Sequence, residues 1–429
     1  MQKKLVEKKY LATFVLVTGL FALWGFANDI TNPMVAAFQT VMEISAAKAS
    51  MIQFAFYGGY FTMAIPAALF IRRYSYKHGI LLGLGLYSLG AFLFIPAAAY
   101  QEFTFFCLSL YILTFGLAFL ETTANPFILS LGDKATSTRR LNLAQAFNPM
   151  GSLLGMLVAS QIVLPALWSD RRDAAGQLIF SGLDAAEKEG IRVHDLAVIR
   201  DPYVALGLVV LVFFLILLFK KMPGKAATNT QMPLRGTLKR LLQNKVYREG
   251  VVAQMFYIGA QIMMWTFIIQ YADRLGLDKA VAQRYNIAAM VLFLSGRFVG
   301  TFLMRFINGR ALLTVFALCA AVLTCGVVII DGMGGLYCLI AVSTFMSVMF
   351  PTIYGIALED VSETDTTLGA AFLVMAIVGG ALMPPLQGMI IDAGEVAGWP
   401  AVNVSFLLPL LCFVMVFVFG YRAYRLRRA

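Results

Sequence analysis

Long apolar runs recur along the whole sequence, and they restrict the possible folds of this chain more than any other feature. Each run is about 20 residues long, the length at which an α-helix crosses a hydrocarbon core of roughly 30 Å. Only 13% of the residues are charged, against about 25% in soluble domains. The sequence predicts an all-α membrane protein with twelve transmembrane helices, at 11–37, 48–71, 78–99, 103–128, 141–164, 202–219, 247–272, 282–306, 311–330, 334–358, 366–391 and 401–421.

Lysine and arginine are unevenly divided between the two sides of these spans. An even number of spans places both termini on one side, and 24 of the 34 basic residues lie in or beside the loops and termini of that side. Cytoplasmic loops carry such an excess, so we expect a multi-pass protein of the cell inner membrane with both termini cytoplasmic. The net charge of +11 then reflects topology and contact with anionic lipid, and nucleic acid is not an expected partner.

Two long polar segments divide the chain. Residues 165–201 are predicted to form an external loop with a short helix around Leu183–Lys188, and residues 220–246 a cytoplasmic linker. The linker separates two predicted six-helix bundles, 1–219 and 247–429. Glycine and proline recur at matching places in the two halves, which is typical of transporters built from a structural repeat. We therefore expect two pseudo-symmetric bundles.

Glu121 lies inside a run that otherwise has the character of a membrane span. A carboxylate at bilayer depth costs roughly 2.5 kcal/mol or more, so it needs a partner, a wet cavity or a proton. Asn125 follows on the same helical face, and Pro126 weakens the helix beside it. This arrangement favours a binding site, although a buried glutamate that only fixes helix packing is the alternative.

Further polar residues occur in other predicted spans. Polar side chains within membrane spans must face a cavity or other polar groups. Hydrogen bonds between helices would explain only one or two of these residues. In the second half, Gln261 and Trp265 share one helical face, and a polar wall opposite an aromatic wall suits a sugar. Besides Glu121 and Asn125, the candidate binding residues are Asp29, Asn32, Gln53, Tyr57, Gln145, Asn148, Gln261 and Trp265.

Other kinds of chemistry have little support in the sequence. The five cysteines lie in apolar runs without metal-ligand spacing, and there are only two histidines, so we expect no metal site and no cofactor. No nucleophile–base pair or nucleotide-binding loop is visible, so we do not expect an enzyme. Gly151 and Gly155, like Gly296 and Gly300, have the spacing of close helix packing. Arg297 could neutralise a buried acid, but we rather expect it toward the cytoplasmic end of its span, where it would brace the bundle.

The two acids Asp29 and Glu121 suggest coupling to protons. Desolvation disfavours the charged form of a buried acid, so its protonation can follow the side of the membrane to which it opens. A carrier that has bound substrate and proton would be neutral and free to reorient. A sodium site that uses Asp29 and nearby carbonyl groups is the alternative.

Six motifs resemble the fucose permease branch of the major facilitator superfamily, the fucose–proton symporters, over nearly the whole chain. The motifs are AFYGGYF at 55–61, LETTANPF at 120–127, RLNLAQAFN at 140–148, YIGAQ at 257–261, GRFVGT at 296–301 and FMSVMFPTI at 345–353. The resemblance implies that Glu121 is the functional glutamate of span 4 and that Gln145 and Asn148 are substrate-facing amides. In span 1 the family has Asn and then Asp three residues later, whereas here Asp29 and Asn32 have exchanged places.

From the resemblance we expect a monomeric secondary active transporter with the major facilitator fold, which imports L-fucose or a related hexose with protons by alternating access. Relatives that carry glucose, galactose or N-acetylglucosamine make these sugars alternative substrates. A proton-coupled exporter of amphipathic compounds is a second alternative, and a non-transporting sugar sensor is a third.

Overall fold

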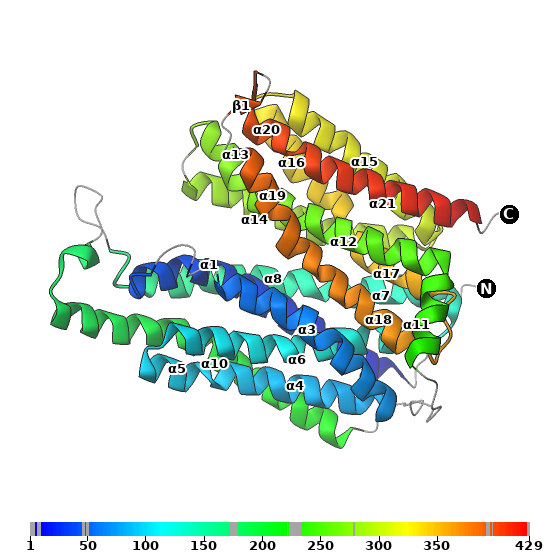
Figure 1. Cartoon of the computed structure of the whole chain (residues 1–429), viewed down its shortest axis with the longest axis horizontal. Coiled ribbons are helices and arrows are strands. Elements are labelled where there is room, and N and C mark those ends of the chain that lie inside the picture. The colour runs from blue at the N-terminus through cyan, green and yellow to red at the C-terminus, as the bar shows by residue number, and fades with distance from the viewer. Residues whose placement is uncertain are drawn as a thin grey trace.

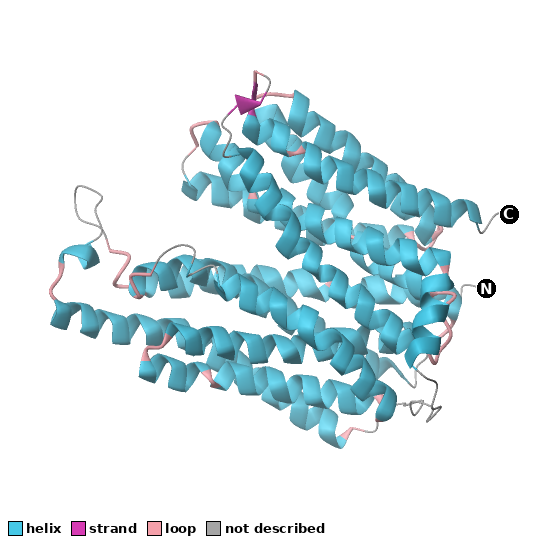
Figure 2. Ribbon diagram, in the orientation of Figure 1, coloured by secondary structure: helices cyan, strands magenta, loops and turns pink. Residues whose placement is uncertain are grey.

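The structure is a computed structural model that describes residues 5–6, 10–44, 48, 51–171, 179–220, 222, 234–277, 279–391, 395–396 and 398–426. Within these residues, twelve helical segments are long and apolar enough to cross a membrane, which confirms the predicted number of spans. The chain is therefore a multi-pass membrane protein. Figure 2 shows that helices make up almost all of it, joined by short loops.

The first six spans are formed by α1 (Leu11–Val41), α3 (Met51–Arg73), α4 (Tyr76–Phe92) with α5 (Phe94–Tyr100), α6 (Phe103–Ser130), α7 (Ser137–Gln145) with α8 (Phe147–Val158), the π-helical turn η3 (Ala159–Val163) and α9 (Leu164–Ala166), and α10 (Ala185–Phe219). The last six are formed by α12 (Lys245–Thr266) with α13 (Ile268–Arg274), α14 (Lys279–Leu303), α15 (Gly309–Ile329), α16 (Met333–Met346) with α17 (Met349–Leu358), α18 (Thr366–Met375) with η5 (Ala376–Val378) and α19 (Gly379–Ile391), and α20 (Ala401–Ser405) with α21 (Leu407–Leu426). Between spans lie the 3-10 turns η2 (Lys134–Thr136) and η4 (Ile179–Gly182), the helix α11 (Leu234–Gln243) and the antiparallel pair β1 (Glu395–Val396) and β2 (Trp399–Pro400).

The helices form two groups that follow the order of the chain. Helices α1 to α10 lie together, and α12 to α21 lie together beside them (Figure 1). Both termini and α11 are found at one end of the molecule, which we call the terminal end, and the two groups diverge toward the opposite end. This is the pair of six-helix bundles expected from the sequence.

One predicted segment differs from the structure. The second part of the expected external loop, residues 185–201, is instead the start of α10, which runs without interruption from Ala185 to Phe219. Residues 172–178 of that loop lie outside the described part of the structure. A capping box begins this helix, since the Asp184 side chain accepts a hydrogen bond from the Glu187 N–H and the Glu187 side chain bonds back to Asp184. The polar first turns continue the span beyond its apolar part, so a search for apolar runs misses them.

The amphipathic helix α11 is tied to the second bundle by an ion pair. Arg240 donates two hydrogen bonds of 2.7 Å to the carboxylate of Asp365, which directly precedes α18. Burial alone would raise the pKa of Asp365, but hydrogen bonds from Arg240, Ser362 and Thr237 and the positive charge of Arg240 hold that pKa below its usual value. The carboxylate therefore stays charged at neutral pH and keeps α11 against the start of α18.

Glycines allow α1 and α8 to approach closely. A Cβ atom at Gly151 would lie 1.8 Å from the carbonyl oxygen of Ala22, and one at Gly25 would lie 1.9 Å from that of Asn148. In the second bundle, a Cβ atom at Gly296 would lie 2.4 Å from the carbonyl oxygen of Thr344. The structure thus confirms that Gly151 and Gly296 serve helix packing.

We predict that Gly151→Ala lowers the thermal unfolding temperature of the purified protein in detergent. The added methyl group must push α8 away from the α1 backbone, and overpacking of this kind costs typically about 1–3 kcal/mol. Gly190→Ala is the matched control, because a Cβ atom at Gly190, inside α10, meets nothing within 4 Å. An unfolding temperature for Gly151→Ala equal to that of the native protein would contradict the close packing of α1 on α8.

Candidate functional site

A cavity lies between the two bundles, and both contribute to its wall. The first bundle contributes mainly polar side chains and the second mainly apolar and aromatic ones. The lining residues are Phe21, Trp24, Asn28, Asp29, Tyr57, Tyr60, Glu121, Gln145, Asn148, Pro149 and Ser152 from the first bundle, and Ile258, Gln261, Ile262, Trp265, Met290, Phe293, Arg297, Phe350 and Ile377 from the second. Seven of the ten candidate binding residues are therefore brought together.

Helical spacing explains why these polar residues share one wall. Tyr57 and Tyr60 are three residues apart on α3, so they face the same side of that helix. Gln145 and Asn148 have the same spacing across the short break between α7 and α8. The close approach of α1 and α8 then places Asp29 of α1 beside this group.

Glu121 presents its side chain to the cavity and is only partly buried. Among the described residues, its carboxylate has no hydrogen-bond or ion-pair partner. The alternative, that Glu121 is bonded to a neighbouring helix only to fix packing, is therefore not supported by any hydrogen bond or ion pair of its carboxylate among the described residues. Asp29 also lines the cavity, with 7% of its surface exposed.

Asn125 lies behind the cavity wall. It is fully buried and does not line the cavity, so the structure does not place it in direct contact with a ligand there. Its Nδ2 donates to the backbone carbonyl of Glu121 at 3.1 Å, and its Oδ1 accepts a hydrogen bond of 2.8 Å from Gln145 Nε2. These two bonds hold the Asn125 amide inside the protein, where it orients Gln145.

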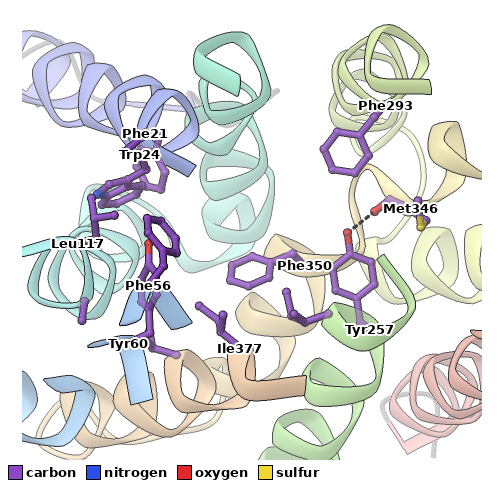
Figure 3. Close-up of a cluster of buried hydrophobic side chains, with 14 of the residues drawn as sticks. Phe21, Trp24, Phe56, Tyr60, Leu117, Tyr257, Phe293, Met346, Phe350 and Ile377 are labelled. Carbon is purple, nitrogen blue, oxygen red and sulfur yellow. Dashed lines mark hydrogen bonds between the residues drawn. The ribbon is translucent and has the colours of Figure 1, made fainter. Parts of the chain in front are cut away.

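The opposite wall is aromatic and held in a fixed orientation. Trp265 donates its indole N–H to Ser343 Oγ at 3.2 Å and packs edge-on against Phe293 at 4.9 Å between ring centroids. Figure 3 shows Phe293 and Phe350 on this side, with Phe21 and Trp24 across from them. A ligand with hydroxyl groups and an apolar face would find a complementary surface on each side.

The side chains of Asn32 and Gln53 lie outside the described part of the structure. Several lining residues were not among the candidates, notably Trp24, Tyr60, Phe293 and Arg297. Trp24 lies four residues before Asn28 on α1, and this spacing was a usable signal. For Arg297 the signal was a single charge inside a span.

Arg297 lies near the end of α14, six residues before Leu303, and it also lines the central cavity, with 3% of its surface exposed. Its Nε donates to the backbone carbonyl of Ser347 at 2.5 Å and its Nη1 to that of Gln145 at 2.8 Å. A backbone carbonyl in the other bundle leaves no sequence pattern, so this contact was not predictable.

The described residues contain no group of three or more His, Cys, Asp or Glu side chains placed to hold a metal ion.

Comparison with known proteins gives consistent matches over most of the chain. Residues 15–384 match the family model of the Major Facilitator Superfamily. The chain is 63% identical to the L-fucose-proton symporter of Haemophilus influenzae over 99% of this chain and 100% of that protein. It is 29% identical to the glucose/galactose transporter of Brucella abortus over 96% and 94% of the two chains. Its fold matches the crystal structure of the transporter FucP in the outward conformation, with a TM-score of 0.88, 32% identity, and 97% and 99% of the chains covered.

We predict that an apolar carbodiimide, which reacts with protonated carboxyl groups, modifies Glu121 in the purified protein. The group faces a cavity and has no partner among the described residues, whereas Asp195 is fully buried and accepts hydrogen bonds from the N–H groups of Trp168 and Ser169. Peptide mass spectrometry should find the adduct at Glu121, lose it in Glu121→Gln and find none at Asp195. Modification of Asp195 with Glu121 left untouched would contradict this account of the cavity.

Proposed function

Because this chain belongs to the major facilitator superfamily, we propose that it is a secondary active transporter that carries L-fucose or a related hexose together with protons by alternating access. The observation that carries the proposal is the position of Glu121, an acid without a partner among the described residues, in the wall of a cavity shared by both bundles. The similarity to the L-fucose-proton symporter of Haemophilus influenzae supports the same substrate class.

The two walls of the cavity suit the two faces of a hexose. Asp29, Tyr57, Gln145 and Asn148 offer acceptors and donors to sugar hydroxyl groups, and Asn32 and Gln53 are proposed to join them. On the opposite wall, Gln261 supplies an amide and Trp265 a flat surface for the C–H face of the ring. Asn125 takes the supporting role of orienting Gln145.

Glu121 is proposed to carry the coupled proton, with Asp29 as the second acid of the site. A charged carboxylate without a cation beside it is costly inside a membrane protein, so a closed, dry cavity favours the protonated form. The proton neutralises the carboxylate while the sugar fills the cavity, and the loaded carrier then reorients. In the other state the cavity opens to the opposite side, where the proton and the sugar leave.

We assign the moving units to residues 1–219 and 247–429, joined by the linker 220–246. The protein is proposed to act as a monomer in the cell inner membrane with both termini in the cytoplasm. The terminal end is then cytoplasmic, and the cavity of this structure faces outward. The similarity to FucP in the outward conformation supports this orientation.

Glucose and galactose are the second candidate substrates. The observation that favours them is the 29% identity to the Brucella abortus glucose/galactose transporter over nearly the whole chain. A sugar panel separates the possibilities, because a hydrogen-bonding site rejects analogues that lack the hydroxyl groups it pairs.

We predict that proteoliposomes containing the native protein accumulate labelled L-fucose when a pH gradient is imposed. Glu121→Gln and Asp29→Asn should reduce this accumulation to the level of empty liposomes. Glu121→Gln should retain sugar exchange without a gradient, because glutamine resembles the protonated acid. Unlabelled fucose, glucose and galactose added as competitors identify the preferred sugar.

The control is Glu395→Gln, since Glu395 is an exposed carboxylate in β1, away from the cavity. It should accumulate sugar as the native protein does. Full gradient-driven accumulation in both Glu121→Gln and Asp29→Asn would refute the roles assigned to the two acids.

A further inference from the structure

Arg297 is the charged residue of the cavity whose role the transport proposal leaves open. Its guanidinium group is buried between the bundles and contacts no carboxylate among the described residues. Instead it donates to two backbone carbonyl groups, Ser347 O of its own bundle and Gln145 O of the other. The ring of Phe293 covers it, with 4.7 Å between the guanidinium carbon and the ring centroid.

Two prolines explain why these carbonyl groups are available. Pro149 and Pro351 have no backbone N–H, so each leaves the carbonyl four residues earlier without its helical donor. Those carbonyls belong to Gln145 and Ser347, which lie at the break between α7 and α8 and at the break between α16 and α17. A single guanidinium group therefore supplies donors to one proline-freed carbonyl in each bundle.

Of the two hydrogen bonds that Arg297 donates, one lies within a bundle and the other joins the two bundles. Arg297 and Ser347 both belong to the second bundle, so their bond moves with it. The bond to Gln145 crosses between the bundles and must break when they separate at that level. Arg297 is thus held at one end, while its other contact can be released.

Other polar side chains lie between the level of Arg297 and the terminal end, where the two bundles are in contact and the pathway is closed. Asn142 Nδ2 donates to Thr352 Oγ1 of the other bundle at 3.2 Å. Asn142 Oδ1 and both polar atoms of the Gln254 side chain are buried without hydrogen-bond partners among the described residues. Gln254 lies two helical turns from the cavity residue Gln261 on α12. Water would satisfy these groups if the bundles parted here, as expected for the closed half of an alternating pathway.

We infer that Arg297 is a latch that holds the bundles together at the side of the cavity nearer the terminal end. Its release from the Gln145 carbonyl opens the pathway toward that end. Gln145 links this latch to the bound substrate, because its side chain lines the cavity while its backbone carbonyl accepts the bond from Arg297. Arg297 is in this sense a positioning residue. The inference rests on the proposed transport function for its mechanism, whereas its first test needs no sugar.

The test measures the distance between spin labels at Tyr74→Cys and Phe306→Cys in lipid nanodiscs, in a background without the five native cysteines. Both positions are exposed, at 48% and 70%, and lie at the terminal end, one in each bundle. Electron–electron double resonance should give mainly short distances with Arg297 present. Arg297→Gln should shift the distribution toward longer distances. Arg297→Lys should also shift it, because lysine lacks the fork that reaches both carbonyls, but the shift should be smaller because lysine keeps the charge.

Phe293→Leu is a milder variant, which removes the aromatic cover and keeps the arginine. It should produce a partial shift in the same direction. Thr301→Val is the matched control, because the Thr301 hydroxyl donates only to the Arg297 carbonyl within α14, so the distances should not change. Thermal unfolding identifies the variants that fold.

Unchanged distances in a folded Arg297→Gln variant, or in Phe293→Leu if the former does not fold, would overturn the latch. If the distances shift but no sugar is transported by the native protein, the latch stands and the proposed function fails. If transport is found and the distances do not shift, the proposed function stands and the latch fails.

Discussion

Glu121 presents a carboxyl group to a cavity inside the membrane part of the protein, with no partner for that group among the described residues. An isolated charge in such a place is expensive, and neutralisation by a proton is the simplest remedy that leaves the group free to become charged again. The rest of the site supports this state. Asn125 bonds to the backbone of Glu121 rather than to its carboxylate, and Gln145 is turned to Asn125. These two amides therefore leave the acid available to a ligand or a proton.

The two bundles divide the work of the cavity between them. Carboxylates, amides and phenols come mainly from the first bundle, and rings and aliphatic side chains from the second. Proline contributes to both, because it interrupts helices at the level of the cavity and frees backbone carbonyls there. Arg297 uses two of these carbonyls, so the helix breaks also become the place where the bundles are joined.

The features that depend on local sequence were predictable. Apolar length fixes the spans, and the cost of a charge in lipid identifies Glu121 as unusual. Features that depend on contacts with other helices were not, whether in the other bundle, as for the bond from Arg297 to the Gln145 carbonyl, or in the same one. Asn125 was expected to face the cavity, but helical spacing cannot tell which of two neighbouring polar groups points inward to orient the other. The start of α10 at Ala185 is a local feature that was nevertheless missed, because a capping box sets it and the spans were located by apolar length alone.

The central claim is that Glu121 changes its protonation as the carrier works, and infrared difference spectroscopy of the purified protein measures this directly. Spectra recorded with and without L-fucose should differ in the carbonyl stretching band of a protonated carboxyl group, and that band should be absent in Glu121→Gln. A difference spectrum without any carboxyl band, or with the same band in Glu121→Gln, would contradict the account.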